Sequence, residues 1–398
     1  MLLSLPPMNA WHNILRLFII KASHWFMLVM PIVVLFYNDN GLGMQDVFIL
    51  QAVYSISIVV LEIPSGFFAD ALGRKNTLVI GTILGFFGFL TYSLTSGFWG
   101  FLVAEVVLGF GQSMISGADS ALLYDSLLSE KRENSYVKYE GRMVSLGNFA
   151  EAFAGIIGGL LATVSLRTPY FAQTLVALAA VPAALTLFEP KVHEIKLKLG
   201  FSEVIKVVKY SLVDNVQLRW NIIFSSIVGA STLSMAWFVQ PWFMSIGLPK
   251  GMFGVMWTLL NLSVGITALY AYRIERMFGM KFTLWATVVL LSLGFFWVAG
   301  SKSIWGFVPL FIFYLVRGIA TPVLKDYINR HSNSNVRATV LSVRNFAIRI
   351  IFSIAGPIYG WATDRLSLSA ALTIAGLVLV VLSAISLLFL MRSVKRIA

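Results

Sequence analysis

The stretch ALTIAGLVLVVLSAISLLFLM, residues 371–391, contains no charged side chain anywhere along its length. An α-helix rises about 1.5 Å per residue, so a helical run of this length reaches about 30 Å, the thickness of the hydrocarbon core of a bilayer. A helix that rests on a soluble core has a polar face and carries charges on it. The stretch therefore predicts a helix that spans a membrane.

The whole chain shares this character. Of its 398 residues, 58% are hydrophobic and 12% are charged, whereas soluble domains carry about 25% charged residues. A backbone in lipid must satisfy its own hydrogen bonds, as helices or as a closed barrel whose strands alternate over about 10 residues. The apolar runs here are long and continuous, so we predict an all-α membrane protein. It would have twelve transmembrane helices, near residues 11–37, 44–69, 76–95, 98–127, 139–164, 169–188, 218–244, 251–273, 281–299, 304–328, 337–362 and 368–391.

Lysine and arginine gather in every second connection and in the C-terminal tail. The odd-numbered connections hold only Arg167, Lys250, Lys302 and Arg365. Because cytoplasmic loops are rich in these residues, the pattern places both termini in the cytoplasm of a multi-pass protein of the inner or plasma membrane. It also accounts for the net charge of +12 without a nucleic-acid partner.

The two halves of the chain resemble each other weakly. Three segments recur in the same order at an offset of about 200 residues: Leu72–Leu78 with Phe278–Leu284, Leu123–Asp125 with Leu324–Asp326, and Ser145–Ala150 with Ser342–Ala347. Transporters use such repeats to place a binding site between two bundles. We predict an N-terminal six-helix bundle over residues 1–188, a cytoplasmic linker over 189–217, and a C-terminal six-helix bundle over 218–398.

The linker contains an amphipathic pattern. Phe201, Val204, Ile205, Val208 and Leu212 fall on one helical stripe, with lysines on another. A helix of this kind lies at the membrane interface, where its lysines meet anionic headgroups. The alternative is a helix that binds a partner protein.

The sharpest motif is Gly66-Phe-Phe-Ala-Asp70-Ala-Leu-Gly73-Arg74-Lys75, between the second and third predicted helices. It resembles the G-x-x-x-D-R-x-G-R-[RK] signature of the major facilitator superfamily and departs from it at Ala71. The resemblance extends over the whole chain through its length, topology and repeat. It implies two six-helix bundles that rock about a central cavity lined by helices one, four, seven and ten. Helix two would pack against eleven, and helix five against eight.

The same resemblance implies a set of gating residues that latch the cytoplasmic side. In that set Asp70 would face the N-terminus of helix eleven near Arg337, and Arg74 would bridge carboxylates such as Asp125. Glu62 and Arg344 lie about 12 Å and about 10.5 Å inside the same membrane surface by helix rise, so we predict a buried ion pair between them. The alternative gives each a partner in its own half. The full predicted gating set is Glu62, Gly66, Asp70, Gly73, Arg74, Lys75, Asp125, Arg337 and Arg344.

Charged and polar residues within the spans are candidates for substrate binding or proton coupling. A charge at such depth costs at least about 2.5–3.5 kcal/mol, so it is paired or faces water. The alternatives are structural ion pairs and, for the histidine, an ordinary interhelical hydrogen bond. The candidates are Glu105, Asp119, Glu151, Arg317, Arg349, His24, Trp237 and Gln240.

Two of these candidates lie in altered family motifs. Glu105-Val-Val-Leu-Gly109 stands where the family often has Arg-x-x-x-Gly. Glu151 precedes Ala154-Gly-Ile-Ile-Gly-Gly159, which resembles the G-P-x-x-G-G signature of proton-driven antiporters, with Gly155 in place of proline. The alternative for this second motif is that its small residues serve a helix–helix contact.

The sequence shows no phosphate-binding loop, no clustered metal ligands and no placed nucleophile, so we predict neither an enzyme nor a cofactor. We predict a secondary transporter that exports a small organic molecule, anionic or amphipathic, in exchange for protons. It would act by alternating access, as a monomer in the bilayer. The alternatives are proton-coupled uptake of an organic anion or nutrient, and a lipid-moving or receptor-like protein on the same scaffold.

Overall fold

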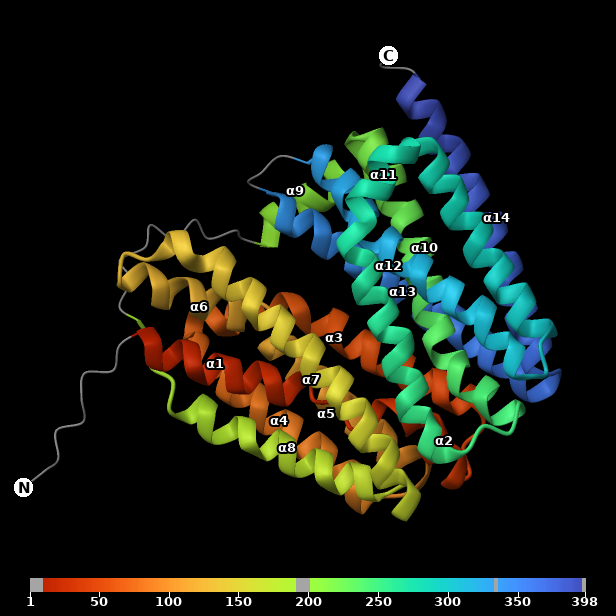
Figure 1. Ribbon diagram of the computed structural model, residues 1–398. Helices are drawn as coiled ribbons and strands as arrows, with labels where there is room; N and C mark the ends of the chain where they lie inside the picture. The colour runs from red at the N-terminus through yellow and green to blue at the C-terminus, as the bar shows by residue number, and fades with distance from the viewer. Residues whose placement is uncertain (1–9, 191–200, 333–335, 396–398) are drawn as a thin grey trace, which may run out of the picture. The chain divides into compact units, whose positions relative to one another are not determined.

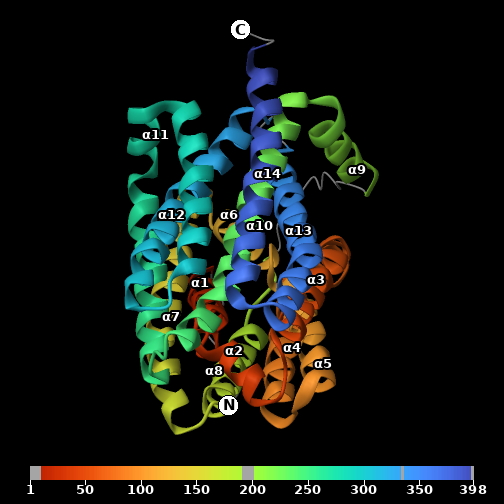
Figure 2. The same cartoon turned by 90° about the vertical axis from the view of Figure 1, so that its right-hand side faces the viewer.

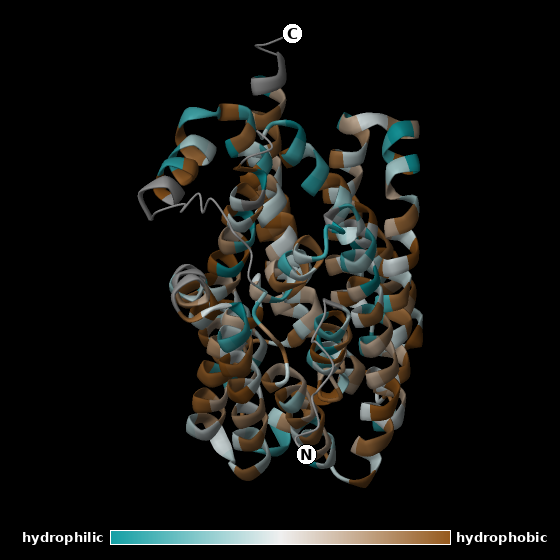
Figure 3. Ribbon diagram, turned by 90° about the vertical axis from the view of Figure 1, so that its left-hand side faces the viewer, coloured by the Kyte–Doolittle hydropathy of each residue, from teal (hydrophilic) through white to brown (hydrophobic). Residues whose placement is uncertain are grey.

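The computed structural model describes residues 10–190, 201–332 and 336–395. Within these ranges the chain forms helices joined by short turns, and no residue lies in a strand. Hydrophobic residues, drawn in brown in Figure 3, occur along all of the long helices. Eleven helical stretches of the described chain are long and apolar enough to cross a membrane. The protein is therefore an all-α, multi-pass membrane protein.

The helices gather into two compact units. Unit 1 comprises Met1–Leu42, Val53–Ile195 and Pro249–Thr258, and unit 2 comprises Gly43–Ala52, Lys196–Leu248 and Leu259–Ala398. Two short segments thus group with the half of the chain to which they do not belong by sequence. Each unit is described by itself below.

Unit 1 is built from the first eight helices, except for the start of α3, and also includes Pro249–Thr258. They are α1 (Ala10–Trp25), α2 (Val33–Asp39), α3 (Met44–Leu72), α4 (Arg74–Leu94), α5 (Gly97–Ile115), α6 (Ala118–Ser129), α7 (Tyr136–Val164) and α8 (Thr168–Leu185). In Figure 1, α4 packs against α5 and α8, and α1 packs against α7 and α8. Leu17, Leu122, Leu127 and Met143 are fully buried in a core shared by α1, α6 and α7. This core fixes the positions of the polar side chains on the same helices.

Unit 2 holds the start of α3 and the remaining helices, except for the start of α11. They are α9 (Phe201–Lys209), α10 (Val216–Ser245), α11 (Lys250–Gly300), α12 (Phe307–Arg330), α13 (Arg337–Arg365) and α14 (Leu368–Lys395). Helix α10 packs against α13 and α14, which run beside it in Figure 2. The uncharged run over residues 371–391 lies within α14. Its helix is confirmed as a candidate membrane span.

The first span is broken, which the sequence pattern did not predict. Helix α1 ends at Trp25, and α2 begins at Val33 after a 3₁₀ turn over Met30–Ile32 that contains a proline. At the break the backbone N–H of Leu28 donates to the side-chain oxygen of the buried Gln173, at 2.8 Å. A buried backbone donor freed by a helix break needs such a partner. Gln173, 145 residues away, therefore makes the break tolerable.

The fourth span is broken as well. Helix α5 ends at Ile115 and α6 begins at Ala118, with Gly117 between them at φ +84°. This backbone region is strained for residues with a Cβ, so the glycine permits the break. Apolar periodicity predicted one continuous helix over 98–127, because the break does not interrupt the apolar run. Discontinuous helices are where transporters bind substrates and ions.

Helix α11 covers Lys250–Gly300 and contains a kink at Gly279, whose φ of +78° lies outside the helical region. This glycine opens the segment that repeats the Gly73 motif in the second half of the chain. Gly73 itself has φ +89° and is the N-cap residue directly before α4. The two glycines thus play the same backbone role at equivalent positions.

The predicted linker contains α9, which continues into a π-helical turn over Tyr210–Asp214. The interfacial position of this helix stays a prediction, and of the predicted stripe Leu212 packs against the buried group around Val207. Val207 is buried with Leu218 and Ile328, whereas Ile205 is about half exposed. A short helix can turn its apolar side partly toward unit 2, and this orientation depends on residues far away in sequence. Residues 191–200 of the linker lie outside the described residues.

Candidate functional site

A buried ion pair joins the two broken spans of unit 1. The Nζ atom of Lys21 in α1 lies 2.8 Å from Oδ2 of Asp119 in α6, and both side chains are largely shielded from water. His24, one turn after Lys21, lies close to Asp119 and to Gln112 of α5. The structure thus brings together two of the predicted coupling residues, His24 and Asp119. It adds Lys21, which the sequence argument did not single out.

The helix ends reinforce this arrangement. Asp119 is in the first turn of α6, where its Oδ1 atom accepts the backbone N–H of Ser120 at 2.8 Å. His24 is in the last turn of α1. Helix dipoles favour an anion at a helix N-terminus and a cation at a C-terminus. The start of α6 at the second break therefore favours the Asp119 carboxylate inside the membrane span.

A second polar group begins at the next residue of α6. The Ser120 hydroxyl donates to Oε1 of Glu140 in α7 at 3.0 Å. Burial, and after it the Glu140 carboxylate, raises the pKa of the Tyr136 phenol. A tyrosine with a raised pKa stays protonated at neutral pH and remains a hydrogen-bond donor. Polar contacts therefore continue from Asp119 toward the N-terminal end of α7.

Arg74 and Asp125, two predicted gating residues, are in contact. The guanidinium of Arg74 forms an ion pair with Asp125 and also donates to the backbone carbonyl of Ala121 at 2.7 Å. Gly73 begins the helix with a positive φ, as its role in a tight turn requires. The surroundings of Gly66 and the side chain of Asp70 lie outside the described residues.

Glu189 is a partner of this region that the sequence argument missed. Its carboxylate accepts the backbone N–H groups of Arg74 and Lys75 at 3.0 Å and 2.8 Å, and so caps α4 from the segment after α8. The first N–H groups of a helix have no partner inside the helix. No local capping pattern reveals this contact, because Glu189 is separated from α4 by more than 100 residues.

Glu105 lies elsewhere in unit 1, within a cluster of tyrosines. Its Oε1 atom accepts the hydroxyls of Tyr37 at 2.8 Å and Tyr92 at 2.7 Å. Both phenols are buried, and their rings pack against Phe101. The carboxylate is thus held by hydroxyl donors among aromatic rings, a setting that suits a structural role.

We expect Glu105→Ala to lower the free energy of unfolding by about 1.5–3 kcal/mol, because two buried phenols lose a charged acceptor. Proton coupling per folded molecule should remain. Thermal unfolding in detergent, followed by transport assays on the folded fraction, measures both effects. Glu130→Gln, at a more exposed carboxylate, is the matched control. Unchanged stability, or lost coupling in fully folded protein, would contradict this assignment.

Glu151 is half-buried in α7, next to the glycines that resemble the antiporter signature. These glycines make a close helix contact inside unit 1. A Cβ on Gly254 of α11 would lie 2.1 Å from the carbonyl oxygen of Gly155, and one on Gly159 would lie 2.9 Å from Gly254. The Thr258 hydroxyl donates to the carbonyl of Ala152 at 3.0 Å. The small residues therefore permit the backbones of α7 and α11 to touch.

The candidates of unit 2 are spread over three helices. Trp237 and Gln240 are buried in α10. Arg317 is half-buried in α12, with its guanidinium 5.6 Å from the centre of the Tyr314 ring. Arg349 is half-buried in α13, and Arg337 is exposed at the start of that helix.

Arg344 is the most deeply buried of the predicted cations, at 5% exposure. Its Nε donates to the hydroxyl of Ser225 in α10 at 2.5 Å, and its Nη1 donates to the side chain of Asn345 at 3.2 Å. Glu62 is half-buried in α3 and belongs to unit 1, whereas Arg344 belongs to unit 2. A contact between the two residues therefore stays a prediction.

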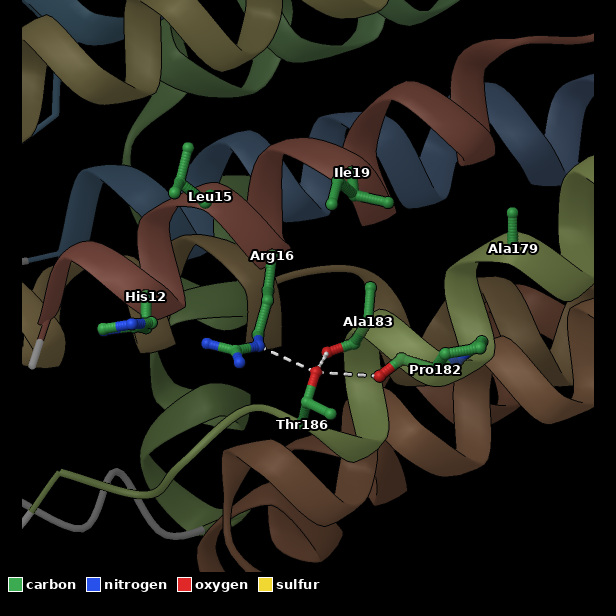
Figure 4. A pocket seen from close by; sticks show the side chains of 8 residues that line it. All are labelled: His12, Leu15, Arg16, Ile19, Ala179, Pro182, Ala183 and Thr186. Carbon is green, nitrogen blue, oxygen red and sulfur yellow. Dashed lines mark hydrogen bonds between the residues drawn. The ribbon is translucent and has the colours of Figure 1, made fainter. Parts of the chain in front are cut away.

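A groove of about 450 Å³ lies between α1 and α8, lined by His12, Leu15, Arg16, Ile19, Ala179, Pro182, Ala183 and Thr186. Figure 4 shows Arg16 reaching toward Thr186, whose hydroxyl accepts its Nε at 2.7 Å. Lys21 follows His12 by about two and a half helical turns, so it lies on the opposite face of α1. The groove is therefore separate from the Lys21–Asp119 pair.

An all-helical membrane protein with buried charges at two helix breaks has the features of a secondary transporter. Comparison with known proteins agrees. The family model described as "Major Facilitator Superfamily" matches residues 22–357. The chain belongs to the major facilitator superfamily of transporters.

Among curated proteins, the chain is similar to the quinolone resistance protein NorA of Staphylococcus aureus strain MRSA252. The two are 28% identical over 165 residues, which make up 41% of this chain and 42% of that protein. The match thus spans about two-fifths of the length of this relative.

Among solved structures, the fold is similar to the nucleoside transporter NupG, with a TM-score of 0.76 and 14% identity over 97% of this chain and 98% of that one. It is also similar to the D-xylose-proton symporter, with a TM-score of 0.68 and 13% identity over 95% and 96%. A bacterial homologue of the lysosomal transporter Spinster, inward-facing and unoccupied, gives a TM-score of 0.74 and 14% identity over 97% of each chain. These structures support the fold.

Proposed function

We propose that this transporter exports a small organic molecule in exchange for protons. The observation that carries the proposal is the Lys21–Asp119 ion pair, buried where two spans break and flanked by His24. Buried charges inside a span are costly and mark ion or substrate pathways. A titratable carboxylate in such a place is suited to take up and release a proton.

The ion pair offers a physical link between protons and substrate. Deprotonated Asp119 attracts Lys21, and protonation removes the charge that holds the lysine in place. Breaking a buried pair leaves an uncompensated charge, which favours rearrangement or the entry of a charged group. Proton binding at Asp119 and substrate binding near Lys21 would therefore be coupled. His24 supplies a second titratable group beside the carboxylate.

The direction of transport is proposed from the resemblance to NorA, a protein named for quinolone resistance. Resistance to a drug is the effect that export produces. The substrate we propose is an amphipathic or anionic organic molecule, for which Arg317 and Arg349 in unit 2 supply positive charge. The second candidate is proton-driven uptake of an organic anion, for which the buried Arg344 and the neighbouring Lys325 would supply positive charge.

The proposed topology has twelve spans with both termini in the cytoplasm of the inner membrane. A straight helix of 51 residues, the length of α11, would reach about 76 Å, more than twice the hydrocarbon thickness. The kink at Gly279 supports two crossings within α11. In this topology residues 1–188 and residues 218–398 form the two six-helix bundles, and residues 189–217 join them. The transporter acts as a monomer.

The cytoplasmic latch is also part of the proposal. The contact between Arg74 and Asp125 supports it, while the expected positions of Asp70 near Arg337 and of Glu62 near Arg344 await a test. Residues that close the cytoplasmic side in one conformation must separate in the conformation that opens it, because the two conformations exchange during transport.

Accumulation of a fluorescent quinolone in cells tests the direction of transport. Cells that express the chain should retain less of the compound than cells with an empty vector. A protonophore should remove the difference, because export depends on the proton gradient. Greater accumulation on expression, also abolished by the protonophore, would instead support uptake.

A further inference from the structure

The N-terminus of α3 is capped by a residue from the far end of α13. The carboxylate of Asp364 accepts the backbone N–H of Met44 at 2.9 Å through Oδ1, and that of Gln45 at 2.7 Å through Oδ2. Both partners belong to unit 2, because Gly43–Ala52 is part of that unit. The first N–H groups of a helix lack partners and carry the positive end of its dipole. One side chain therefore satisfies two donors and the dipole together.

The two helices approach closely below this cap, and they run antiparallel. Gly360 faces Met44, where an added Cβ would lie 2.5 Å from the Met44 carbonyl oxygen, and Gly356 faces the ring of Phe48. Further along, the Ser353 hydroxyl donates to the carbonyl of Ala52 at 3.4 Å. Gly356, Gly360 and Asp364 are spaced by four, so they form one ridge on α13.

The cap has the properties of a contact that can open. Asp364 is exposed to solvent, so water can replace it at the two N–H groups. The helix also keeps a local partner, because Asp46 in its own first turn accepts the N–H of Gly43 at 3.3 Å. When Asp364 withdraws, the Asp46 carboxylate therefore still lies at the N-terminus of α3.

The same sequence pattern ends both helices. Gly360-Trp-Ala-Thr-Asp364-Arg-Leu366 ends α13 and repeats the spacing of Gly66-Phe-Phe-Ala-Asp70-Ala-Leu72, which ends α3. Each reads Gly-x-x-x-Asp-x-Leu. Only the first copy lies in the motif that the sequence argument singled out.

We propose that Asp364, with Gly356 and Gly360, forms a second latch, which holds the N-terminal end of α3 on α13 in one transport state and releases it in the other. This inference rests on the proposed transport function. With both termini cytoplasmic, the latch lies on the side of the inner membrane that faces away from the cytoplasm. In this structure the latch is closed.

Distances between spin labels test the latch. The chain contains no cysteine, so the substitutions Asp39→Cys and Leu366→Cys, both at exposed positions, place two nitroxides without removing a native thiol. In reconstituted protein we expect Asp364→Asn to raise the ratio of long to short distances about threefold to tenfold, because an amide cannot accept both N–H groups as a carboxylate does. Asp46→Asn is the matched control, since it removes the same charge from the same helix end without touching α13.

A second pair of variants tests the same contact by size. Gly360→Ala should shift the distances in the same direction as Asp364→Asn, because its Cβ pushes against the α3 backbone. Gly265 of α11 has open space around the position of an added Cβ. Gly265→Ala should therefore leave the distances between the labels unchanged. Melting temperatures show whether each variant is folded, and the readout uses the folded fraction.

The latch is overturned if Asp364→Asn leaves the distances as in the parent, or shifts them no more than Asp46→Asn. A parent protein with a single distance under all pH and substrate conditions would overturn it too. Failure of the proposed function looks different. It would appear as a lack of proton-driven transport. The distances between the labels can be measured whether or not the protein transports.

Discussion

Asp119→Asn is expected to reduce proton-driven transport at least about tenfold. The amide cannot take up a proton, so the site loses the charge change that couples the gradient to substrate movement. It also leaves Lys21 without its partner 2.8 Å away, and an unpaired buried charge costs about 3–5 kcal/mol. Transport into proteoliposomes with an imposed pH gradient measures the loss of coupling. Thermal unfolding measures the loss of stability.

The double variant Lys21→Met with Asp119→Asn separates these two effects. Removing both charges should recover much of the stability, because no charge then remains unpaired. It should not recover the response to the gradient. Glu130→Gln, at a more exposed carboxylate, is the control and should behave as the parent. A folded Asp119→Asn protein with full gradient response would show that Asp119 is a structural residue.

Gly254→Ala is expected to disrupt the contact between α7 and the start of α11. The added Cβ would lie 2.1 Å from the Gly155 carbonyl oxygen, a backbone atom that cannot move away by a change of rotamer. Overpacking of this kind costs about 1–3 kcal/mol and sometimes more. The melting temperature should fall, and transport should drop severalfold in the protein that remains folded.

Gly265→Ala is the matched control for this experiment. It lies on the same helix, and nothing comes within 4 Å of the Cβ that it would add. The alanine should be neutral or slightly stabilising there, because it lowers the backbone entropy cost of a glycine. Equal effects of the two substitutions would mean that the close approach of Gly254 to α7 has no consequence.

The helical membrane architecture follows from local properties of the sequence. Apolar runs identify the spans, and glycines with positive φ mark the starts of α4 and of the second part of α11. A chain of this composition has few other ways to satisfy its backbone in lipid. The family, too, was predicted from the motif around Asp70 and is confirmed by the match over residues 22–357.

The contacts of the candidate site could not be predicted in the same way. Lys21 and Asp119 are 98 residues apart, and Lys21 has no local feature that distinguishes it from other lysines near a helix. The break between α5 and α6 depends on Gly117. The break between α1 and α2 depends on the distant side chain of Gln173, which accepts a backbone N–H that the break frees. Hydropathy averages over such breaks and so predicts one continuous helix.

The carboxylates of the spans show the same limit. Glu105, Asp119 and Glu151 are alike in the sequence argument, because each is an acidic residue in an apolar run. In the structure Asp119 meets a lysine, whereas Glu105 meets two tyrosine hydroxyls. These partners come from other helices, so packing determines the chemistry of each carboxylate.

Proteoliposomes with an acidic interior test the central claim most directly. A fluorescent quinolone is added outside, and its accumulation in the lumen is followed with and without the pH gradient. An antiporter accumulates the compound as protons leave, and Asp119→Asn should abolish this accumulation. Accumulation that requires an acidic exterior instead, or that is equal without a gradient, would contradict proton-coupled export.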